Sequence, residues 1–320
     1  MKRAWLIGLG LLGFGTLPAE ARAQLPFDCS YTVSPVLDFG AGTGLPTAQV
    51  DAVATVQVTC ASLLNLARLR VCLSIPEGTG GVSVADRRMV LADRSIGYQL
   101  YRDSGRSVVW GTFGDALPVD FSFSVLNLPQ SRTVTVYGRL PSGQSGQTVG
   151  DYASSLTPIV ARRQSYSLLF GSAPSCSGVT GDPETLDPIE VEYAVEPSCS
   201  VTAQPLDFGT VAGVLVARTA TSNLSVTCTE GGAWSIGLDG GTTTGDVTDR
   251  RMELGSGETL LYELYRDAGH TLPWGTLPAV RVDGTGTGVA QSVPLYGLVP
   301  AQGLRPIGTY SDRVTVTVYY

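Results

Sequence analysis

The sequence predicts an all-β protein made of two small antiparallel β-sandwiches in tandem. Its 39 Gly and 19 Pro among 320 residues, together with abundant Val, Thr and Ser, are typical of many short strands joined by tight turns. Apolar and polar residues alternate along several stretches, and the whole pattern of motifs occurs twice. Because 43% of the residues are hydrophobic and only 15% are charged, the chain can bury a core.

The first 23 residues have the three parts of a secretory signal peptide. Lys2 and Arg3 precede an apolar run over residues 4–17, and residues 21–23 (Ala-Arg-Ala) match the small-x-small pattern of a cleavage site. We therefore expect residues 1–23 to be removed and the mature, exported protein to begin near Gln24. Export leads to an oxidising compartment, so the six cysteines are predicted to form disulfides.

Charge and composition argue against nucleic-acid binding and against most enzymes. Removing Lys2, Arg3, Glu20 and Arg22 with the signal changes the net charge from −7 to −9, which disfavours binding to nucleic acid. Lys2 is the only lysine and His270 the only histidine, which removes most routes to an activated nucleophile, a Schiff base or a histidine-rich metal site. We predict no enzymatic activity, no cofactor and no metal.

One set of landmarks occurs twice in the same order. The landmarks are two cysteines and the motifs Leu-Asp-Phe-Gly, Asp-Arg-Arg-Met, Leu-Tyr-Arg-Asp and Trp-Gly-Thr. Each copy is predicted to form one sandwich, the first over residues 24–196 and the second over residues 197–320. The landmarks lie at Cys29, Cys60, 37–40, 86–89, 100–103 and 110–112 in the first copy and at Cys199, Cys228, 206–209, 249–252, 264–267 and 274–276 in the second.

Strands and turns can be placed between these landmarks. Residues 53–59 and 314–318 alternate with period two, as strands with one buried face do. Residues 103–106 and 267–270 carry hairpin-turn chemistry, which predicts a solvated His270. The repeat predicts the disulfides Cys29–Cys60 and Cys199–Cys228, which leaves Cys72 and Cys176 to pair with each other in the first copy.

The two copies end differently. The second copy finishes with a strand over residues 313–320, whose counterpart in the first copy is 156–170. The first copy then continues through a Gly/Ser/Pro-rich stretch into a further alternating strand, so it owns one strand that the second copy lacks. We expect this strand to complete the first sandwich with the side chains of Ile189, Val191, Tyr193 and Val195.

The second sandwich is therefore predicted to lack its last strand and to accept one from another molecule. A missing edge strand leaves unpaired N–H and C=O groups beside apolar pockets. Only residues 24–28 precede Cys29 after cleavage, too few to donate a long strand, so we expect a subunit at the end of a linear polymer. The candidate groove residues, which are otherwise ordinary core residues, are Val201, Leu206, Phe208, Val314, Val316 and Val318.

Together these motifs resemble the spore coat protein U family, whose members include the pilins of archaic (Csu-type) chaperone–usher pili. The terminal Gly-Thr-Tyr-Ser-Asp of residues 308–312 adds to the resemblance. It implies incomplete immunoglobulin-like sandwiches, completed first by a periplasmic chaperone and then by the N-terminal extension of the next subunit. The two-domain form resembles a tip subunit, with an outer adhesive domain and an inner pilin domain.

Loops of the first copy are candidates for adhesion. Between Cys60 and Cys72 lies an apolar turn where the second copy has a plain polar hairpin, and a longer loop surrounds Trp110. Exposed apolar loops would bind hydrophobic surfaces, although the turn could instead pack onto its own domain; Trp110, matched by Trp274, is expected in the core. The candidate contact residues are Leu63, Leu64 and Leu66 in the turn, and Val108, Val109, Phe113 and Leu117 in the longer loop.

The sequence thus predicts an exported, non-enzymatic tip adhesin at the cell surface that promotes attachment and biofilm formation. Its expected partners are a periplasmic chaperone, an outer-membrane usher, the next pilin and a hydrophobic or abiotic surface. Residues 86–88 and 249–251 (Asp-Arg-Arg) are expected to be structural turns with a local ion pair. The alternatives are a coat or pilus-shaft subunit of the same fold, and a hydrolase or carbohydrate-binding sandwich with a polar pocket in the first domain.

Overall fold

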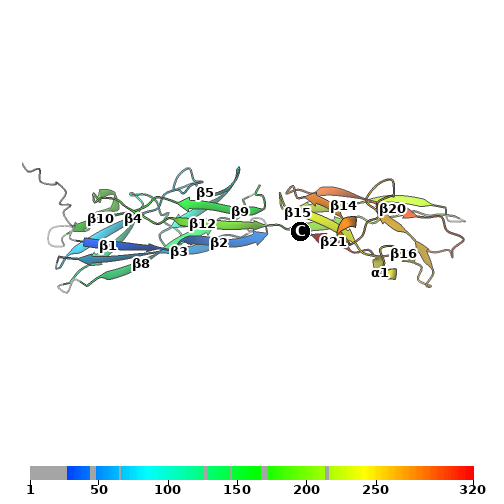
Figure 1. The fold of residues 1–320 in the computed structure, drawn as a ribbon, viewed down its shortest axis with the longest axis horizontal. Coiled ribbons are helices and arrows are strands. Elements are labelled where there is room, and N and C mark those ends of the chain that lie inside the picture. The colour runs from blue at the N-terminus through cyan, green and yellow to red at the C-terminus, as the bar shows by residue number, and fades with distance from the viewer. Residues whose placement is uncertain are drawn as a thin grey trace, which may run out of the picture.

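The computed structural model describes residues 27–43, 48–64, 66–124, 128–144, 146–166, 172–212 and 216–320. Within these residues the protein is almost entirely β-structure and forms two sandwiches that lie end to end (Figure 1). The predicted signal peptide, residues 1–23, lies outside the described residues.

The first sandwich runs from Phe27 to Glu196. Its strands are β1 (Phe27–Val33), β2 (Val36–Thr43), β3 (Val50–Ser62), β4 (Arg68–Ser74), β5 (Arg87–Leu91), β6 (Arg94–Tyr101), β7 (Leu117–Ser122), β8 (Gln130–Leu140), β9 (Gly150–Leu156), β10 (Ile159–Tyr166), β11 (Glu184–Leu186) and β12 (Ile189–Glu196), with one 3-10 helix, η1 (Cys176–Gly178). One sheet has the order β1-β3-β8-β6-β5-β9-β12-β2 and the other β11-β10-β4-β7. Both contribute to one buried core.

The second sandwich follows after a two-residue connection. Its strands are β13 (Cys199–Ala203), β14 (Arg218–Cys228), β15 (Ala233–Leu238), β16 (Arg251–Glu253), β17 (Thr259–Leu261), β18 (Glu263–Tyr265), β19 (Val282–Thr285), β20 (Gln291–Val299) and β21 (Val316–Tyr319), with the short helices α1 (Gly241–Thr244) and η2 (Pro278–Val280). The sheets have the orders β13-β14-β20-β18, β19-β15-β21 and β16-β17, and they enclose a second core. The predicted fold class of two tandem antiparallel sandwiches is confirmed.

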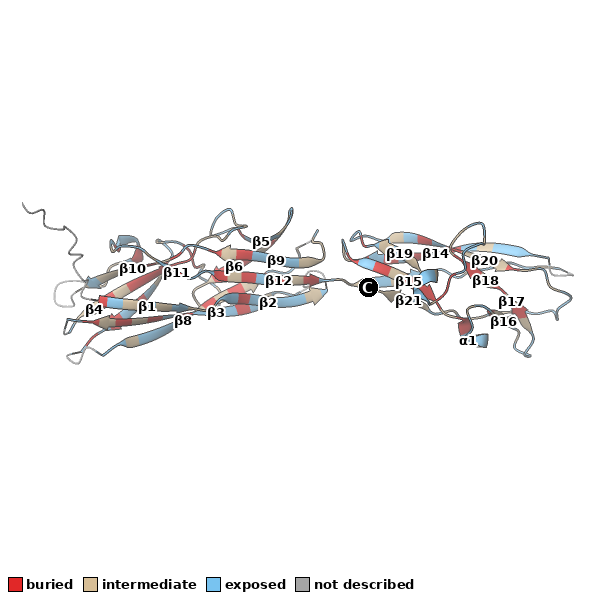
Figure 2. Ribbon diagram, in the orientation of Figure 1, coloured by how far each residue is buried: buried red, intermediate tan, exposed pale blue. Residues whose placement is uncertain are grey.

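Strand alternation explains why these residues form sheets. In β3 the side chains of Ala52, Ala54, Val56 and Val58 are buried while the residues between them are exposed. Figure 2 shows the same alternation of buried and exposed residues along the strands of both sandwiches. Each strand therefore covers its own core with one face and leaves the other to solvent.

The two tryptophans occupy equivalent core positions, as expected. Trp110 and Trp274 are completely buried. The indole nitrogen of Trp110 donates to the Leu73 carbonyl at 2.8 Å, and that of Trp274 donates to the Ile236 carbonyl at 2.9 Å. Burial of a large side chain with its one donor satisfied makes each tryptophan a centre of its core.

The repeated Asp-Arg-Arg motif contains a buried cation that sequence reasoning missed. Arg88 pairs with Asp86 as expected, but the side chain of Arg87 is 1% exposed. Arg87 donates to five acceptors, among them the carbonyls of Ile75 and Trp110 at 3.1 and 2.6 Å. Burial lowers the pKa of Arg87 to about 10, so it stays charged at neutral pH.

The second copy repeats this arrangement. Arg251 pairs with Asp249, while the buried Arg250 donates to the carbonyls of Leu238 and Trp274. Burial also lowers the pKa of Arg250. The motif therefore supplies one exposed ion pair and one internal guanidinium that ties three segments of each sandwich together.

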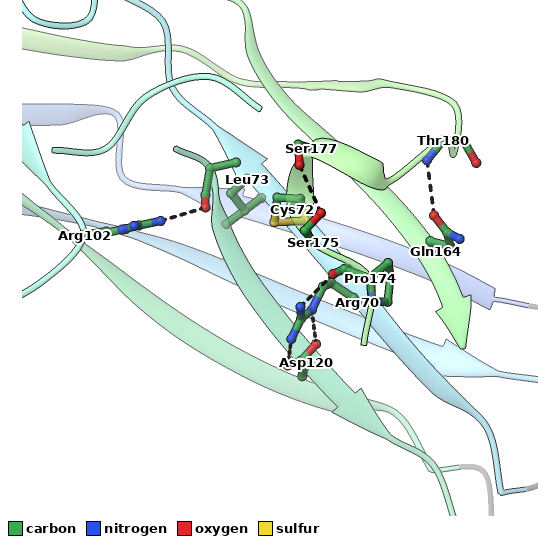
Figure 3. The surroundings of a disulfide bond; sticks show 12 residues. Arg70, Cys72, Leu73, Arg102, Asp120, Gln164, Pro174, Ser175, Ser177 and Thr180 are labelled. Atoms are coloured by element: carbon green, nitrogen blue, oxygen red, sulfur yellow. Dashed lines mark hydrogen bonds and ion pairs between the residues drawn. A yellow bond between two sulfur atoms is a disulfide. The ribbon is translucent and has the colours of Figure 1, made fainter. Parts of the chain in front are cut away.

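Three disulfides are present, in the predicted pairs. Cys29–Cys60 and Cys199–Cys228 each join residues that lie opposite each other on neighbouring strands. Cys72–Cys176 instead fixes the segment between β10 and β11 to β4 (Figure 3). Beside it the carbonyl of Pro174 accepts a hydrogen bond from Arg70 at 2.7 Å, and the same guanidinium forms two hydrogen bonds to Asp120.

Two expectations need correction. The continuation of the first copy after β10 forms two strands rather than one, because β11 precedes β12 and pairs with β10, where Arg163 and Glu184 form a 2.8 Å ion pair. β11 has only three residues and lies in a polar stretch, so the sequence shows no alternation of apolar and polar residues that would predict a strand there. His270 is half-buried rather than solvated, because its ring lies edge-on to the rings of Tyr265 and Tyr296. The distances between ring centroids are 5.3 and 6.4 Å.

The predicted final strand of the first copy, residues 156–170, is divided in the structure. β9 ends at Leu156 and β10 begins at Ile159, where the chain crosses from one sheet to the other. β10 ends at Tyr166, and residues 167–170 lie outside the described residues.

Candidate strand-acceptor groove and apolar tip

Strand β12 fills a slot in the first sandwich. It pairs antiparallel with β9, from Ile189 opposite Leu156 to Val195 opposite Gly150, and parallel with β2 on its other side. The side chains expected to complete the sandwich are buried in the core: Ile189, Val191, Tyr193 and Val195. β12 therefore supplies both backbone pairing and four side chains between β9 and β2.

No strand occupies the corresponding slot within the described part of the second sandwich. The segment 308–314, which corresponds to β9, meets β16 in a single bridge between Ser311 and Glu253. The same bridge in the first sandwich joins Ala153 to Val90. The segment 308–314 thus contacts β16 along one edge, while its other edge has no partner strand in residues 197–212 and 216–320.

The walls of this open slot are built as in the first sandwich. A Cβ on Gly138 would lie 2.8 Å from Leu37 and 3.0 Å from Phe39, so this glycine makes room for both side chains. A Cβ on Gly297 would lie 2.6 Å from Leu206 and 2.8 Å from Phe208, so this glycine makes room for these two side chains in the same way. Leu37 and Phe39 are buried, whereas Leu206 and Phe208 are only half-buried.

All the candidate groove residues lie around the second core and keep part of their surface exposed. They are half-buried hydrophobic residues packed against that core, in contrast to the buried row that β12 contacts in the first sandwich. They come from β13, from β21 and from the two segments that flank the slot: Val201, Val316, Val318, Leu206, Phe208 and Val314.

An aspartate holds the segment beside the open slot. Asp312 accepts hydrogen bonds from Tyr262 Oη at 2.6 Å and from both the backbone nitrogen and the hydroxyl of Thr242 at 2.9 Å. At the equivalent positions of the first sandwich, Tyr98 Oη donates a 3.2 Å hydrogen bond to the hydroxyl of Ser154, which carries no charge. Burial disfavours the ionised carboxylate of Asp312, but these hydrogen bonds outweigh burial and leave its pKa below the usual 3.8.

Four exposed leucines gather at the far end of the first sandwich. Leu63 and Leu66 are 77% and 76% exposed and Leu64 is 48% exposed, so the turn does not pack onto its own domain. Leu128, which is 65% exposed, precedes the start of β8, opposite the end of β3 that leads into this turn. In the sequence, the only indication that Leu128 could contribute to such a surface is its place among apolar residues in a connection between strands. We call Leu63, Leu64, Leu66 and Leu128 the apolar tip.

The second candidate loop lies away from the apolar tip. Val109 bridges to Tyr101, and Leu117 pairs with Leu73 at the end of β4 that is remote from the turn. Val108 is 37% exposed, while Val109, Phe113 and Leu117 are half-buried. Phe113 lies 4.3 Å from the guanidinium of Arg162. The structure therefore does not bring this loop together with the leucines.

A shallow pocket of about 460 Å³ lies on the outer face of β2, β12 and β9. The acidic side chains on its rim are Asp38, Asp151 and Glu192, and all three are exposed. The lining includes no serine, cysteine, histidine or arginine. The pocket therefore lacks the residues of a Ser/His or Cys/His nucleophile, and its charged groups are three exposed carboxylates.

No group of three or more His, Cys, Asp or Glu side chains among the described residues is placed to hold a metal ion. None of the described helices is long and apolar enough to cross a membrane.

The sequence matches the model of the Spore Coat Protein U domain over residues 15–158 and 185–317. The second segment starts before β12, so the strand that fills the first sandwich belongs in sequence to the second repeat. A curated relative, Protein U from Myxococcus xanthus, is 33% identical over 127 residues, covering 36% of this chain and 71% of that protein.

Two solved structures that align with most of this chain have low sequence identity to it. The CsuC–CsuE chaperone–tip adhesion subunit pre-assembly complex from archaic chaperone-usher Csu pili of Acinetobacter baumannii aligns with a TM-score of 0.49 and 16% identity, covering 91% of this chain and 100% of that chain. The CupB6 tip adhesin from Pseudomonas aeruginosa aligns with a TM-score of 0.41 and 12% identity, covering 92% and 95%. Because the two matched segments span most of the sequence, the chain belongs to the Spore Coat Protein U domain family.

Proposed function

We propose that this protein is the terminal subunit of a chaperone–usher pilus and that its second sandwich accepts a strand from the next pilin. The observation that carries the proposal is the slot filled by β12 in the first sandwich and open in the second. The unpaired backbone and half-buried apolar side chains beside it favour strand addition. A periplasmic chaperone fills the groove before an outer-membrane usher passes the subunit on.

The proposal divides the chain into a removed signal (residues 1–23), an outer adhesive domain (24–196) and an inner pilin domain (197–320). The outer domain needs no partner to complete it, because β12 already occupies its slot. The inner domain needs one added strand. A non-enzymatic subunit of this kind is exported and lies at the cell surface, at the pilus tip.

Coexpression of the full-length chain with the chaperone, usher and pilin of its own assembly system tests this function. We expect a 1:1 complex with the pilin that survives unheated detergent electrophoresis and is lost when the N-terminal segment of the pilin is deleted. A coat or shaft subunit would instead associate end to end with its own copies. Such self-association without a pilin would overturn the proposal.

The apolar tip is the proposed adhesive surface, used for attachment to hydrophobic surfaces and hence for biofilm formation. The end of β3 that leads into the apolar tip lies at the end of the first sandwich remote from the second sandwich, so contact with a surface there leaves the groove accessible (Figure 1). Burial of exposed apolar area contributes about 25 cal/mol per Å².

The double substitution Leu63→Ser with Leu64→Ser should weaken attachment to polystyrene. Full burial of one leucine contributes about 1.5–3 kcal/mol, so partial loss at two positions corresponds to about a tenfold or greater fall in affinity. The measurement is retention of purified chain on polystyrene beads across a concentration series. Leu277→Ser, at a leucine of the second sandwich that is 69% exposed, is the matched control and should bind as the unsubstituted protein does. Unchanged retention of the double variant would move the contact surface elsewhere.

A further inference from the structure

The chain contains one junction of its own, where the hairpin between β14 and β15 meets the loop between β8 and β9. The backbone oxygen of Glu230 accepts hydrogen bonds from the Val149 nitrogen at 2.9 Å and from Thr148 Oγ1 at 3.0 Å. The Glu230 carboxylate forms an ion pair with Arg94 at 2.5 Å. Main-chain contacts and one ion pair therefore join the two sandwiches beside the connection from β12 to β13.

The hairpin is shaped to fit this loop. Gly231 has a φ of +79°, and a Cβ there would lie 2.3 Å from Thr148 Oγ1. A Cβ on Gly232 would lie 3.4 Å from a methyl group of Val149. A side chain at the first of these positions would both strain the backbone and clash, so the glycine allows the two backbones to approach.

The second sandwich has a corresponding loop between β20 and the segment 308–314. Gln144 fixes the start of the first loop by hydrogen bonds to the backbone of Gly97, and Gln302 fixes the second by hydrogen bonds to the backbone of Leu261. Counting from these glutamines, Ile307 takes the place of Val149. Ile307 is fully exposed, whereas Val149 is half-buried by the junction.

The exposed loop is also more apolar than its counterpart. Leu304, which is 77% exposed, and Pro306 stand where the first loop has Gly146 and Thr148. Leu304, Pro306 and Ile307 thus form an uncovered apolar surface at the end of the second sandwich remote from the first. We call it the basal loop.

The position equivalent to Arg94 carries the opposite charge in the second sandwich, where Glu258 lies beside a loop that itself contains the exposed Arg305. Glu258 and Arg94 occupy equivalent positions in the two sandwiches. Arg94 precedes Ser95, which accepts a hydrogen bond from Arg88, and Glu258 precedes Thr259, which accepts one from Arg251. Glu258 is exposed, and its carboxylate accepts a hydrogen bond from Ser256 in its own turn. A hairpin docked here would meet an acidic residue where Glu230 meets a basic one.

We propose that the basal loop and Glu258 form a docking surface for the next subunit, specifically for its hairpin that corresponds to residues 229–232, and that this hairpin carries a lysine or arginine where this chain has Glu230. The inference rests on the proposed function and names a second contact beyond the added strand. Because β12 belongs in sequence to the second repeat, the two sandwiches are joined as successive subunits would be. The internal junction is therefore a template for the external one.

The same geometry selects against a second copy of this chain as occupant. In such a pair Glu230 would face Glu258, and two like charges would replace the ion pair. At the position of Glu258, charge thus favours a hairpin with a basic residue over the hairpin of a second copy of this chain.

Photo-crosslinking of the full-length chain, coexpressed with its chaperone, usher and pilin, tests the docking surface. We replace Ile307 by p-benzoylphenylalanine, irradiate the purified complex and identify the crosslinked peptide by mass spectrometry. The expected product joins position 307 to the pilin hairpin that follows its second cysteine. The same substitution at Leu277, which is also exposed but lies outside the basal loop, should give no such product.

The outcomes separate the two proposals. If the detergent-resistant complex forms but position 307 crosslinks elsewhere or not at all, the docking surface is wrong and the strand-acceptor function stands. If no complex forms with intact pilin, both are wrong.

The charge can be tested in the same complex. Glu258→Arg should lower the crosslink yield from position 307 several-fold at low ionic strength, and less at high salt because exposed charges are screened. Exchanging the basic residue of the pilin hairpin for glutamate should restore the yield. Asp283→Arg, at an exposed position of β19, is the matched control. Equal yields for both arginine variants, or failure of the restoring exchange, would remove Glu258 from the docking surface.

Discussion

A peptide with the sequence of β12, residues 189–196, is expected to raise the unfolding temperature of the second sandwich in the full-length chain. The slot in that sandwich repeats the walls that hold β12, with Leu206 and Phe208 beside Gly297. Peptide bound at 100 times its dissociation constant would add about 2.7 kcal/mol of stability. For a domain of this size the added free energy corresponds to a rise of about 10 °C.

Differential scanning calorimetry of the full-length chain measures this effect, because the two cores are expected to give separate transitions. The transition of the first sandwich should not move, since β12 already fills its slot. The control peptide carries aspartate in place of the residues corresponding to Val191 and Tyr193, which removes two of the inward side chains while keeping the length. If the authentic peptide stabilises neither transition, or stabilises both equally, the open slot does not accept a strand.

Val191→Asp should destabilise the first sandwich by about 4 kcal/mol or more. Val191 is completely buried between Leu37 of β2 and Ser154 of β9. The substitution removes a buried apolar side chain and places an unpaired carboxylate in the core, which are two of the largest single-residue effects known. Since natural domains have a stability of about 5–15 kcal/mol, the first sandwich should lose a large part of its stability and unfold at a much lower urea concentration.

Urea unfolding followed by near-ultraviolet circular dichroism provides the measurement. Glu192→Ser changes the next residue of the same strand, whose side chain is exposed, and should alter stability by less than about 0.5 kcal/mol. A Val191→Asp variant that unfolds at the same urea concentration as the unsubstituted protein would show that β12 does not complete this core.

Much of the fold could be predicted because its determinants are local. The alternation along β3 and β12 reports a buried face directly, and the paired positions of Cys29 with Cys60 follow from the repeat. The count of strands in the two copies also pointed to an unequal completion of the sandwiches. These features depend on neighbours in sequence or on comparison of the two copies.

Other features could not be predicted because they depend on long-range contacts. Arg87 reads as a surface residue, and only the folded chain brings the carbonyls of Ile75 and Trp110 to its guanidinium. Leu128 joins the apolar tip only because β8 pairs with β3, which places the residues before Gln130 beside the end of β3. His270 is covered because the pairing of β18 with β20 places two tyrosine rings against it.

The position of β12 also determines how the molecule responds to pulling. β12 ends at Glu196 and the first strand of the second sandwich begins at Cys199, so a load applied to the second sandwich reaches the first through the end of β12. The load acts along the strand, and the hydrogen bonds to β9 and β2 lie across it on both sides. They must therefore fail together rather than one after another, so the strand that completes the fold also acts as its mechanical clamp.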